Sequence, residues 1–434
     1  MRHRFVIYNQ RGAPCNPQSM TVGQPERKAG ARFALGLLLA INLFNYIDRQ
    51  ILAALEPQIR ATFFDLGDVN AMTKTGALGM VFLVTYMLSA PLLGWLSDRF
   101  SRWLIVGTCV ILWSLASGAS GLAATFGILV VTRVFVGIGE GGYGPAAPTI
   151  LSDLFPIENR GRILAIFCAA IPVGSALGYV LGGLFHEHWR WGFYLLTPPG
   201  ILLGVICFFQ RDPRGLGFSQ LSERNRPRWQ DYRAVLRTRS YLFNCAAQTA
   251  MTFALGGLAF WTPAYLQYRQ QPPTAVVIFG GITVVAGLLS TLLGGVVADR
   301  MRKRFPGSYF LVSGVGMIVA FPLFLGVLYA PFPLAWVFMF CAVFFVFLNT
   351  GPSNTALANV SPPAVRATAF ALNIFVIHLL GDAAAFPIIG YIGGHTNMHV
   401  AFLVVCGMMA VSGVIWLLGM RYLPADTARV EAGS

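Results

Sequence analysis

Long apolar runs constrain this chain more than any other feature of its sequence. The 434 residues contain twelve such runs, and a helix of about 20 apolar residues crosses the ~30 Å hydrocarbon core of a bilayer. The sequence therefore predicts an all-α membrane protein with twelve transmembrane helices, near 31–56, 75–97, 103–123, 126–150, 162–185, 191–210, 241–267, 274–298, 308–330, 333–355, 366–392 and 398–421.

The composition agrees with this prediction. Apolar residues make up 56% of the chain and charged residues only 11%. A soluble domain carries roughly 25% charged residues, because its surface must face water. Most of the surface of this protein is therefore expected to face lipid.

The distribution of lysine and arginine predicts the orientation. With both termini in the cytoplasm, the cytoplasmic segments hold 25 of the 31 basic residues and the outer segments hold four: Arg60, Lys74, Arg190 and Arg269. This is the positive-inside pattern, so the net charge of +14 reflects topology and no nucleic-acid partner is expected. A cell membrane location, in a bacterial inner membrane, fits the length of the spans.

The chain divides into five segments. Residues 1–30 lack the apolar core of a signal peptide and are expected to form a mobile cytoplasmic tail. Residues 31–210 and 241–422 are expected to form two six-helix bundles. The basic linker 211–240 lies between them in the cytoplasm, where it can touch anionic headgroups, and 423–434 form a short cytoplasmic tail.

The two predicted bundles share sequence patterns. The pattern G-x-x-x-D-R occurs at 94–99 and again at 295–300, so its two aspartates are 201 residues apart. A second pattern, P-x-x-x-R, occurs at 156–160 and at 362–366. Such internal repeats predict two pseudo-symmetric six-helix halves.

Ionisable residues inside the spans are candidates for function, because a charge in hydrocarbon is costly. In the fourth span, Arg133 and Glu140 lie two turns apart on one face. Depth along the helices makes a pair between Asp48 and Arg133 feasible. The complete set is Asp48, Arg49, Arg133, Glu140, His378 and Asp382.

These residues suggest a site for substrate and protons. Arg49 and Arg133 would bind an anionic group, since the planar guanidinium suits phosphate or carboxylate. Glu140 or Asp48 would exchange a proton, because burial and a neighbouring arginine act on a carboxyl in opposite directions. The alternative is permanent salt bridges that only fix helix packing. His378 and Asp382, four residues apart, fit a coupling site or a simple satisfied pair.

Neutral polar residues extend the candidate site. Asn45 and Tyr46 share the helix face of Arg49 and are predicted to bind substrate, as is Trp261. Other polar positions either line the cavity or make hydrogen bonds between helices: Asn244, Gln248, Thr249, Thr252, Asn349, Ser353 and Asn354.

With its repeated G-x-x-x-D-R loops, the chain resembles the major facilitator superfamily over nearly its whole length, although Ser101 replaces a usual glycine. This Asp-Arg turn is interpreted as a conformational latch. Asp98 would accept hydrogen bonds from the N-terminus of the eleventh helix, where the helix dipole favours an anion. Arg99 and Arg102 would hold Asp98 in place, and Asp299 and Arg300 are their counterparts. A plain stop-transfer charge cluster is the alternative.

Two branches of the superfamily compete. The sequences NYIDR at 45–49, GIGEGGYGPAAP at 137–148, RDPRG at 211–215 and NTALANVSPPAVR at 354–366 resemble the spinster-like branch. That resemblance implies transport of lysophospholipids or sphingoid phosphates, with Asp48, Arg49, Arg133 and Glu140 in a polar central site. The organic anion symporters for sugar acids and carboxylates have a similar first and fourth helix and are the alternative.

The resemblance implies a monomeric secondary active transporter that works by alternating access, with protons, lysolipid and membrane lipids as its partners and no cofactor. An enzyme is not expected, because the chain has no HExxH, P-loop or acidic metal motif. A receptor that transports nothing is the remaining alternative.

Overall fold

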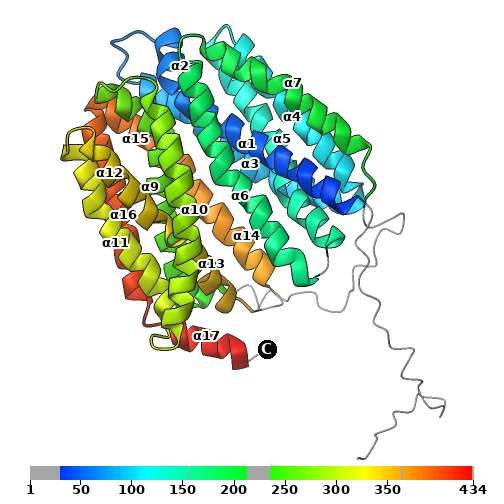
Figure 1. The fold of residues 1–434 in the computed structure, drawn as a ribbon, viewed down its shortest axis with the longest axis vertical. Coiled ribbons are helices and arrows are strands. Elements are labelled where there is room, and N and C mark those ends of the chain that lie inside the picture. Colours follow the sequence, from blue (N-terminus) through cyan, green and yellow to red (C-terminus); the bar gives the residue numbers. More distant parts are fainter. Residues whose placement is uncertain (1–29, 156, 213–234, 363–364, 433–434) are drawn as a thin grey trace, which may run out of the picture.

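The computed structural model describes residues 30–155, 157–212, 235–362 and 365–432, which form an almost entirely helical protein (Figure 1). Residues 1–29 of the predicted mobile tail and most of the linker at 211–240 lie outside this part. The first half contains α1 (Ala31–Ala54), α2 (Glu56–Phe63), α3 (Ala71–Arg99), α4 (Arg102–Leu122), α5 (Phe126–Leu154), α6 (Ile157–Leu184) and α7 (Trp189–Phe208).

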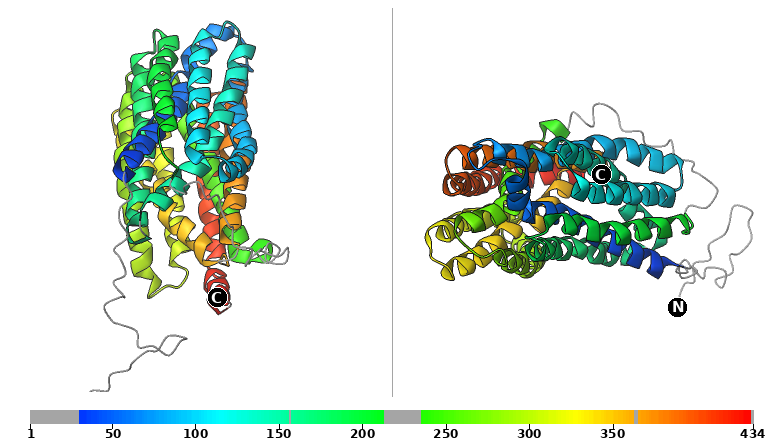
Figure 2. Two further views of the ribbon diagram at one scale, coloured as in Figure 1. Left: turned by 90° about the vertical axis from the view of Figure 1, so that its right-hand side faces the viewer. Right: turned by 90° about the horizontal axis from the view of Figure 1, so that it is seen from above.

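The second half follows the linker. It contains α9 (Arg239–Tyr268), α10 (Ala275–Arg302), α11 (Ser308–Tyr329), α12 (Leu334–Phe347), α13 (Thr350–Asn359), α14 (Arg366–Ile377), the π-helical turn η3 (His378–Asp382), α15 (Ala383–His395), α16 (Met398–Gly419) and α17 (Leu423–Ala432). Seen from above, the two halves lie side by side (Figure 2).

Twelve membrane spans are confirmed. Within the described residues, eleven helical segments are long and apolar enough to cross a membrane, counting α12 with α13, and α14 with η3 and α15, as single spans. The twelfth is α9, which has 30 residues but carries amide side chains that lower its hydropathy. The short helix α2 and the start of α3 mark one end of the bundle, called here the α2 end. The start of α1 and α17 mark the opposite end, called the tail end.

Two spans are interrupted where proline removes a backbone donor. Pro352 cannot donate to the carbonyl of Leu348, and α12 gives way to α13 at that point. Pro387 cannot donate to the carbonyl of Ala383, and the π-helical turn η3 comes directly before Ala383. The sequence prediction treated each span as one continuous helix.

The halves pack together mainly toward the α2 end. There α3 packs on α15, and α6 packs on α10. A Cβ atom at Gly76 of α3 would lie 2.5 Å from the carbonyl oxygen of Phe386 in α15, so only glycine allows this approach. The α6 helix also contacts α9, since the Tyr179 hydroxyl of α6 donates to the carbonyl of Ala259 in α9 over 2.6 Å.

The last helix, α17, docks on the tail end of the second half, where the sequence predicted only a tail. The Asp426 carboxylate accepts hydrogen bonds from the backbone N–H of Ser240 at 3.0 Å and from its hydroxyl at 2.7 Å. Ser240 lies in the first turn of α9, whose N–H groups have no partner within the helix. The aspartate therefore joins the C-terminal segment to the start of the second bundle.

Candidate functional site: a central cavity with paired charges

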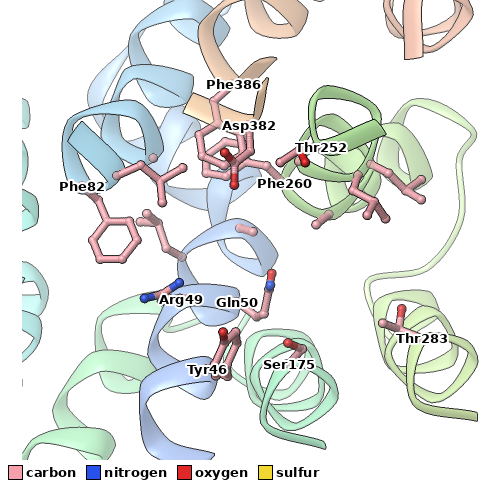
Figure 3. Close-up of a pocket in the computed structure, with 18 of the residues that line it drawn as sticks. Tyr46, Arg49, Gln50, Phe82, Ser175, Thr252, Phe260, Thr283, Asp382 and Phe386 are labelled. Carbon is pink, nitrogen blue, oxygen red and sulfur yellow. The ribbon is translucent and has the colours of Figure 1, made fainter. Parts of the chain in front are cut away.

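A cavity of about 380 Å³ lies between the two halves. This volume is within the range of small-molecule sites in proteins, about 300–1,000 Å³. Both halves contribute to its walls, and Figure 3 shows side chains of α1, α6, α9, α10 and α15 around it. All six ionisable residues predicted from the spans line this cavity: Asp48, Arg49, Arg133, Glu140, His378 and Asp382.

The first ion pair joins α1 to α5. Arg49 Nε lies 2.7 Å from Glu140 Oε2, and the glutamate is fully buried. The guanidinium carbon of Arg49 also lies 5.1 Å from the ring centres of Tyr46, Phe82 and Tyr86. Three ring faces and one carboxylate thus hold the cation by electrostatic attraction. The sequence placed both residues in the site but did not predict that they pair.

The second pair is the predicted one between Asp48 and Arg133. Arg133 Nη1 lies 3.9 Å from Asp48 Oδ2, which is longer than a hydrogen bond. Two serines of α4 also hydrogen-bond to these charged residues. Ser117 donates to Asp48, and Arg133 donates to Ser120. Sequence reasoning missed these serines, although their spacing of three places both on one face of a span.

The second half contributes one ionisable pair. His378 Nδ1 lies 3.0 Å from Asp382 Oδ2, and both residues belong to the π-helical turn η3. Asp382 Oδ1 also accepts a hydrogen bond of 3.2 Å from the backbone N–H of Ala383. The break in the helix therefore presents a carboxylate and an imidazole to the cavity.

The neutral residues predicted for substrate binding divide into two groups. Tyr46 lines the cavity beside Arg49. Asn45 is buried and is not among the described lining residues of the cavity. Trp261 is also fully buried, and its indole nitrogen donates to the carbonyl of Phe386 over 2.9 Å. Trp261 therefore packs at the seam between α9 and α15, outside the described lining of the cavity.

Three of the polar residues predicted in the second half, Asn244, Gln248 and Ser353, hydrogen-bond to other polar side chains, whereas Thr249, Asn349 and Asn354 donate to backbone carbonyls. Gln248 donates to the Ser353 hydroxyl at 3.0 Å and accepts from Asn373 at 2.7 Å. Asn244 accepts from the indole of Trp416 at 3.0 Å. These contacts join α9, α13, α14 and α16 by neutral groups. Of the polar residues predicted there to line the cavity or bridge helices, Thr252 lines it.

The first predicted latch region lies at the tail end of α3. The structure does not describe the side chain of Asp98. Arg99 stacks on Trp95, with its guanidinium carbon 3.6 Å from the ring centre. Arg102 Nη1 lies 2.5 Å from Asp153 Oδ2 at the end of α5. Arg102 thus joins α4 to α5, a contact that the sequence did not predict.

The counterpart of this region lies at the end of α10. Asp299 accepts a hydrogen bond of 2.9 Å from the hydroxyl of Tyr309 in α11, and Arg300 is exposed. The eleventh span begins with α14, which packs on α9, α13 and η3 of its own half. A latch between α3 and α14 remains a prediction for a state in which the tail ends of the halves meet.

Two similar six-helix bundles around a charged cavity define the class of polytopic membrane transporters. A family model for the Major Facilitator Superfamily matches residues 38–385. Protein spinster homolog 3 of Danio rerio is 34% identical over 414 residues, covering 89% of this chain and 81% of the relative. Protein spinster homolog 1 of Homo sapiens is 32% identical, with 95% and 84% covered. The chain therefore belongs to the Major Facilitator Superfamily and, within it, to the spinster family.

Other comparisons agree with this assignment. The sphingosine-1-phosphate transporter SPNS2 of Danio rerio is 34% identical, with 83% of this chain and 75% of the relative covered. A crystal structure of a bacterial homolog to the human lysosomal transporter Spinster, inward-facing and unoccupied, matches with a TM-score of 0.78 at 21% identity, covering 92% of this chain and 98% of that one. This likeness shows the fold. The protein is a transporter and not an enzyme.

Proposed function

We propose that this protein is a proton-coupled secondary transporter for an amphipathic lipid with an anionic headgroup, such as a lysophospholipid or a sphingoid phosphate. The observation that carries the proposal is the composition of the central cavity. Arg49 and Glu140 lie on one wall, and apolar side chains of α10 and α12, including Phe279, Val343 and Phe347, lie on another. A charged headgroup and an acyl chain would each find a suitable surface there.

The relatives support the same substrate class. One curated relative is named as a transporter of sphingosine-1-phosphate. The guanidinium of Arg49 can make two parallel hydrogen bonds to a phosphate, and Glu140 beside it can take up or release a proton when the guanidinium turns to substrate. Exchange of Arg49 between Glu140 and substrate would couple proton movement to transport.

Alternating access is the proposed mechanism. The halves pack together toward the α2 end, which we assign to the outside, and we assign the tail end, where α1 begins and α17 lies, to the cytoplasm. On this assignment the structure corresponds to an inward-facing state of a monomer in a bacterial inner membrane. Rocking of the halves would part the seams at Gly76 and at Tyr179 and bring α3 and α14 together.

Flux of labelled lysophospholipid into proteoliposomes, with and without an imposed pH gradient, tests this proposal. Flux that the gradient stimulates, and that Glu140→Gln makes insensitive to the gradient, is the expected result. Absence of flux from folded, correctly inserted protein would overturn the lipid assignment and favour small organic anions, such as sugar acids, as substrates.

A further inference from the structure

At the tail end, the last span and the first span of the second half meet around one tyrosine ring. Tyr422 follows α16, and its ring stacks on that of Phe243 in α9, with ring centres 5.5 Å apart. The two helices approach closely there, since a Cβ atom at Gly419 of α16 would lie 2.7 Å from Phe243 Cβ. The packing of α16 on α9 therefore fixes the position of Tyr422.

Two positive side chains lie against this ring. The guanidinium carbon of Arg421 lies 4.8 Å from the ring centre of Tyr422, and that of Arg239, the first residue of α9, lies 5.2 Å from it. An aromatic face attracts a guanidinium, so the ring gathers two cations from opposite ends of the second half's sequence. Two like charges in one place repel each other, and a nearby anion would relieve that repulsion.

The described residues supply no such anion. No carboxylate among them forms an ion pair with Arg239 or Arg421, and both arginines are exposed. Asp426 lies close by, but it is buried, accepts two hydrogen bonds from Ser240 and pairs with Arg429 at 3.1 Å. The two guanidiniums thus face their surroundings as unneutralised charges.

The neighbouring surface is apolar and belongs to the spans. Leu242 of α9 and Leu418 of α16 are 47% and 54% exposed. Each lies three residues from one of the arginines, on the side toward the interior of the bilayer, because α9 begins and α16 ends at the tail end. Exposed leucines on a span face acyl chains. The surface therefore offers positive charge at the membrane interface and apolar contact directly below it.

We propose that Arg239, Arg421 and Tyr422 form a binding site for an anionic phospholipid of the leaflet at the tail end. The guanidiniums would bind phosphate oxygens, for which their planar geometry is suited, and the acyl chains would lie along Leu242 and Leu418. Two unpaired cations match two negative charges, so a lipid with two phosphates, such as cardiolipin, fits better than a lipid with one.

This site goes beyond the proposed function, because it does not depend on which solute the central cavity transports. A bound lipid would join α16 to α9, next to the place where Asp426 joins α17 to the same helix. It would therefore stabilise the second half at the tail end.

Native mass spectrometry of the purified protein with defined lipids tests the proposal. Cardiolipin, phosphatidylglycerol and phosphatidylcholine with the same acyl chains are compared. We expect cardiolipin to bind about fivefold more tightly than phosphatidylglycerol, the scale of one basic residue at an anionic surface, and phosphatidylcholine to bind most weakly. Equal affinity for the three lipids would overturn the proposal. Displacement of cardiolipin by millimolar inorganic phosphate would indicate a site for a soluble anion and overturn the lipid assignment.

Variants then locate the tightest cardiolipin site, because other basic residues of the chain also attract anionic lipids. Arg239→Gln and Arg421→Gln should each weaken it about fivefold, and the double variant about 25-fold. Arg304→Gln is the matched control: Arg304 is also exposed at the tail end and lies against a single ring, 5.8 Å from the centre of Phe305. The control should bind cardiolipin as the parent does. An equal loss in the control would show unspecific attraction to this end of the protein and contradict the site.

A charge reversal separates loss of the site from loss of the fold. Arg421→Glu places a carboxylate beside Arg239 and so supplies the missing anion from the protein itself. In lipid-free detergent this variant should unfold at a temperature no lower than the parent, and added cardiolipin, which should raise the unfolding temperature of the parent, should no longer do so. A variant that cardiolipin still stabilises as much as the parent would overturn the proposal.

Discussion

The two halves of this transporter share a fold but hold their buried polar groups together by different chemistry. The first half holds four charges as two ion pairs, Arg49 with Glu140 and Asp48 with Arg133, and all of them except Arg49 are buried. At a similar place the second half buries neutral amides and hydroxyls around Gln248. A buried charge can change its proton or its partner, whereas an amide network mainly fixes geometry. On the proposed mechanism, the paired charges of the first half would carry the coupling, and the amide network would hold the helices of the second half together.

The largest expected effect comes from breaking one ion pair. Arg133→Met leaves the Asp48 carboxylate buried with only Ser117 as its hydrogen-bond partner, which should destabilise the fold by about 3–5 kcal/mol. The double variant with Asp48→Asn removes the charge and should recover most of that loss without restoring transport. Thermal unfolding in detergent, with flux measured in parallel, tests this. A loss in the single variant below about 1 kcal/mol would mean that the pair carries little of the stability.

The second largest effect is expected on transport, where a change at Glu140 of the first half should matter more than a change at Gln248 of the second half. Glu140→Gln keeps the size of the side chain but removes the proton site, and gradient-driven flux should fall about tenfold, a typical size for a coupling energy. Gln248→Glu places a carboxyl in the amide network and is the control. Made in the Glu140→Gln background, this control should not regain the gradient dependence that Glu140→Gln loses. Coupling that survives in Glu140→Gln would place it elsewhere, with Asp48 and Asp382 the next positions to test.

A substitution in the neutral network around Gln248 should lower the stability of the fold and leave the gradient dependence of transport unchanged. Gln248→Leu leaves the Ser353 hydroxyl and the Asn373 amide without this partner, at a cost of about 1–3 kcal/mol. Flux per folded molecule should retain its dependence on the pH gradient. Calorimetry and flux on the same preparation measure both quantities. A change in gradient dependence would show that the second half also takes part in coupling.

The two halves also share a structural feature: in each, an arginine binds the free carbonyls at the end of the third span. Arg190 donates to the carbonyls of Gly121 and Ala123 at the end of α4, both at 2.7 Å. Arg269 donates to the carbonyls of Leu328 and Ala330 at the end of α11, at 2.9 and 2.8 Å. These helices are the third span of each half, and a cation at a helix C-terminus satisfies its free carbonyls.

Replacement of these arginines should destabilise both halves, and the cost should be larger for Arg269, which also donates to the carbonyl of Val327 and to the Tyr265 hydroxyl. Arg190→Gln and Arg269→Gln should each lower the free energy of unfolding by about 1–2 kcal/mol. Thermal unfolding of the two variants side by side measures the difference between them. An equal or smaller loss in Arg269→Gln would mean that its additional hydrogen bonds contribute little to stability.

The smallest effect is expected at Glu56 in α2, outside the spans. Burial raises the pKa of this carboxyl above its ordinary value of 4.5, although Arg60 and the Thr75 hydroxyl oppose the shift. A raised pKa means that the folded state binds the proton more readily, so this contribution to stability is full below pH 4.5 and is lost as pH rises through the raised value. Glu56→Gln should thus be stabilised relative to the parent at pH 8 but not at pH 4. The same difference at both values would contradict this.

Sequence reasoning reached the membrane fold and most of the site because the bilayer leaves few choices. A span needs about 20 apolar residues, so the spans can be counted in the sequence, and α9 was recognised even with its amides. Ionisable residues within spans are rare for the same reason, and all six that were predicted line the cavity. The feasible pair between Asp48 and Arg133 followed from depth alone.

Other features depended on how the helices are rotated against one another. Trp261 looks like a cavity residue in sequence, but its face of α9 turns toward α15. The amides of α9 were equally suited to a cavity or to a network until α13, α14 and α16 were placed around them. The docking of α17 through Asp426 could not be predicted, because its partner Ser240 lies 186 residues away along the chain.

The sequence by itself determined the number of spans, the two similar halves and the identity of the charges in the membrane. Each of these follows from the cost of placing polar groups in hydrocarbon, which acts on every residue locally. Only the tertiary structure decided that Arg49 pairs with Glu140 and that Asp382 faces the cavity from a π-helical turn. Rotation, tilt and partner choice arise from packing between helices far apart in the sequence, and no local pattern encodes that packing.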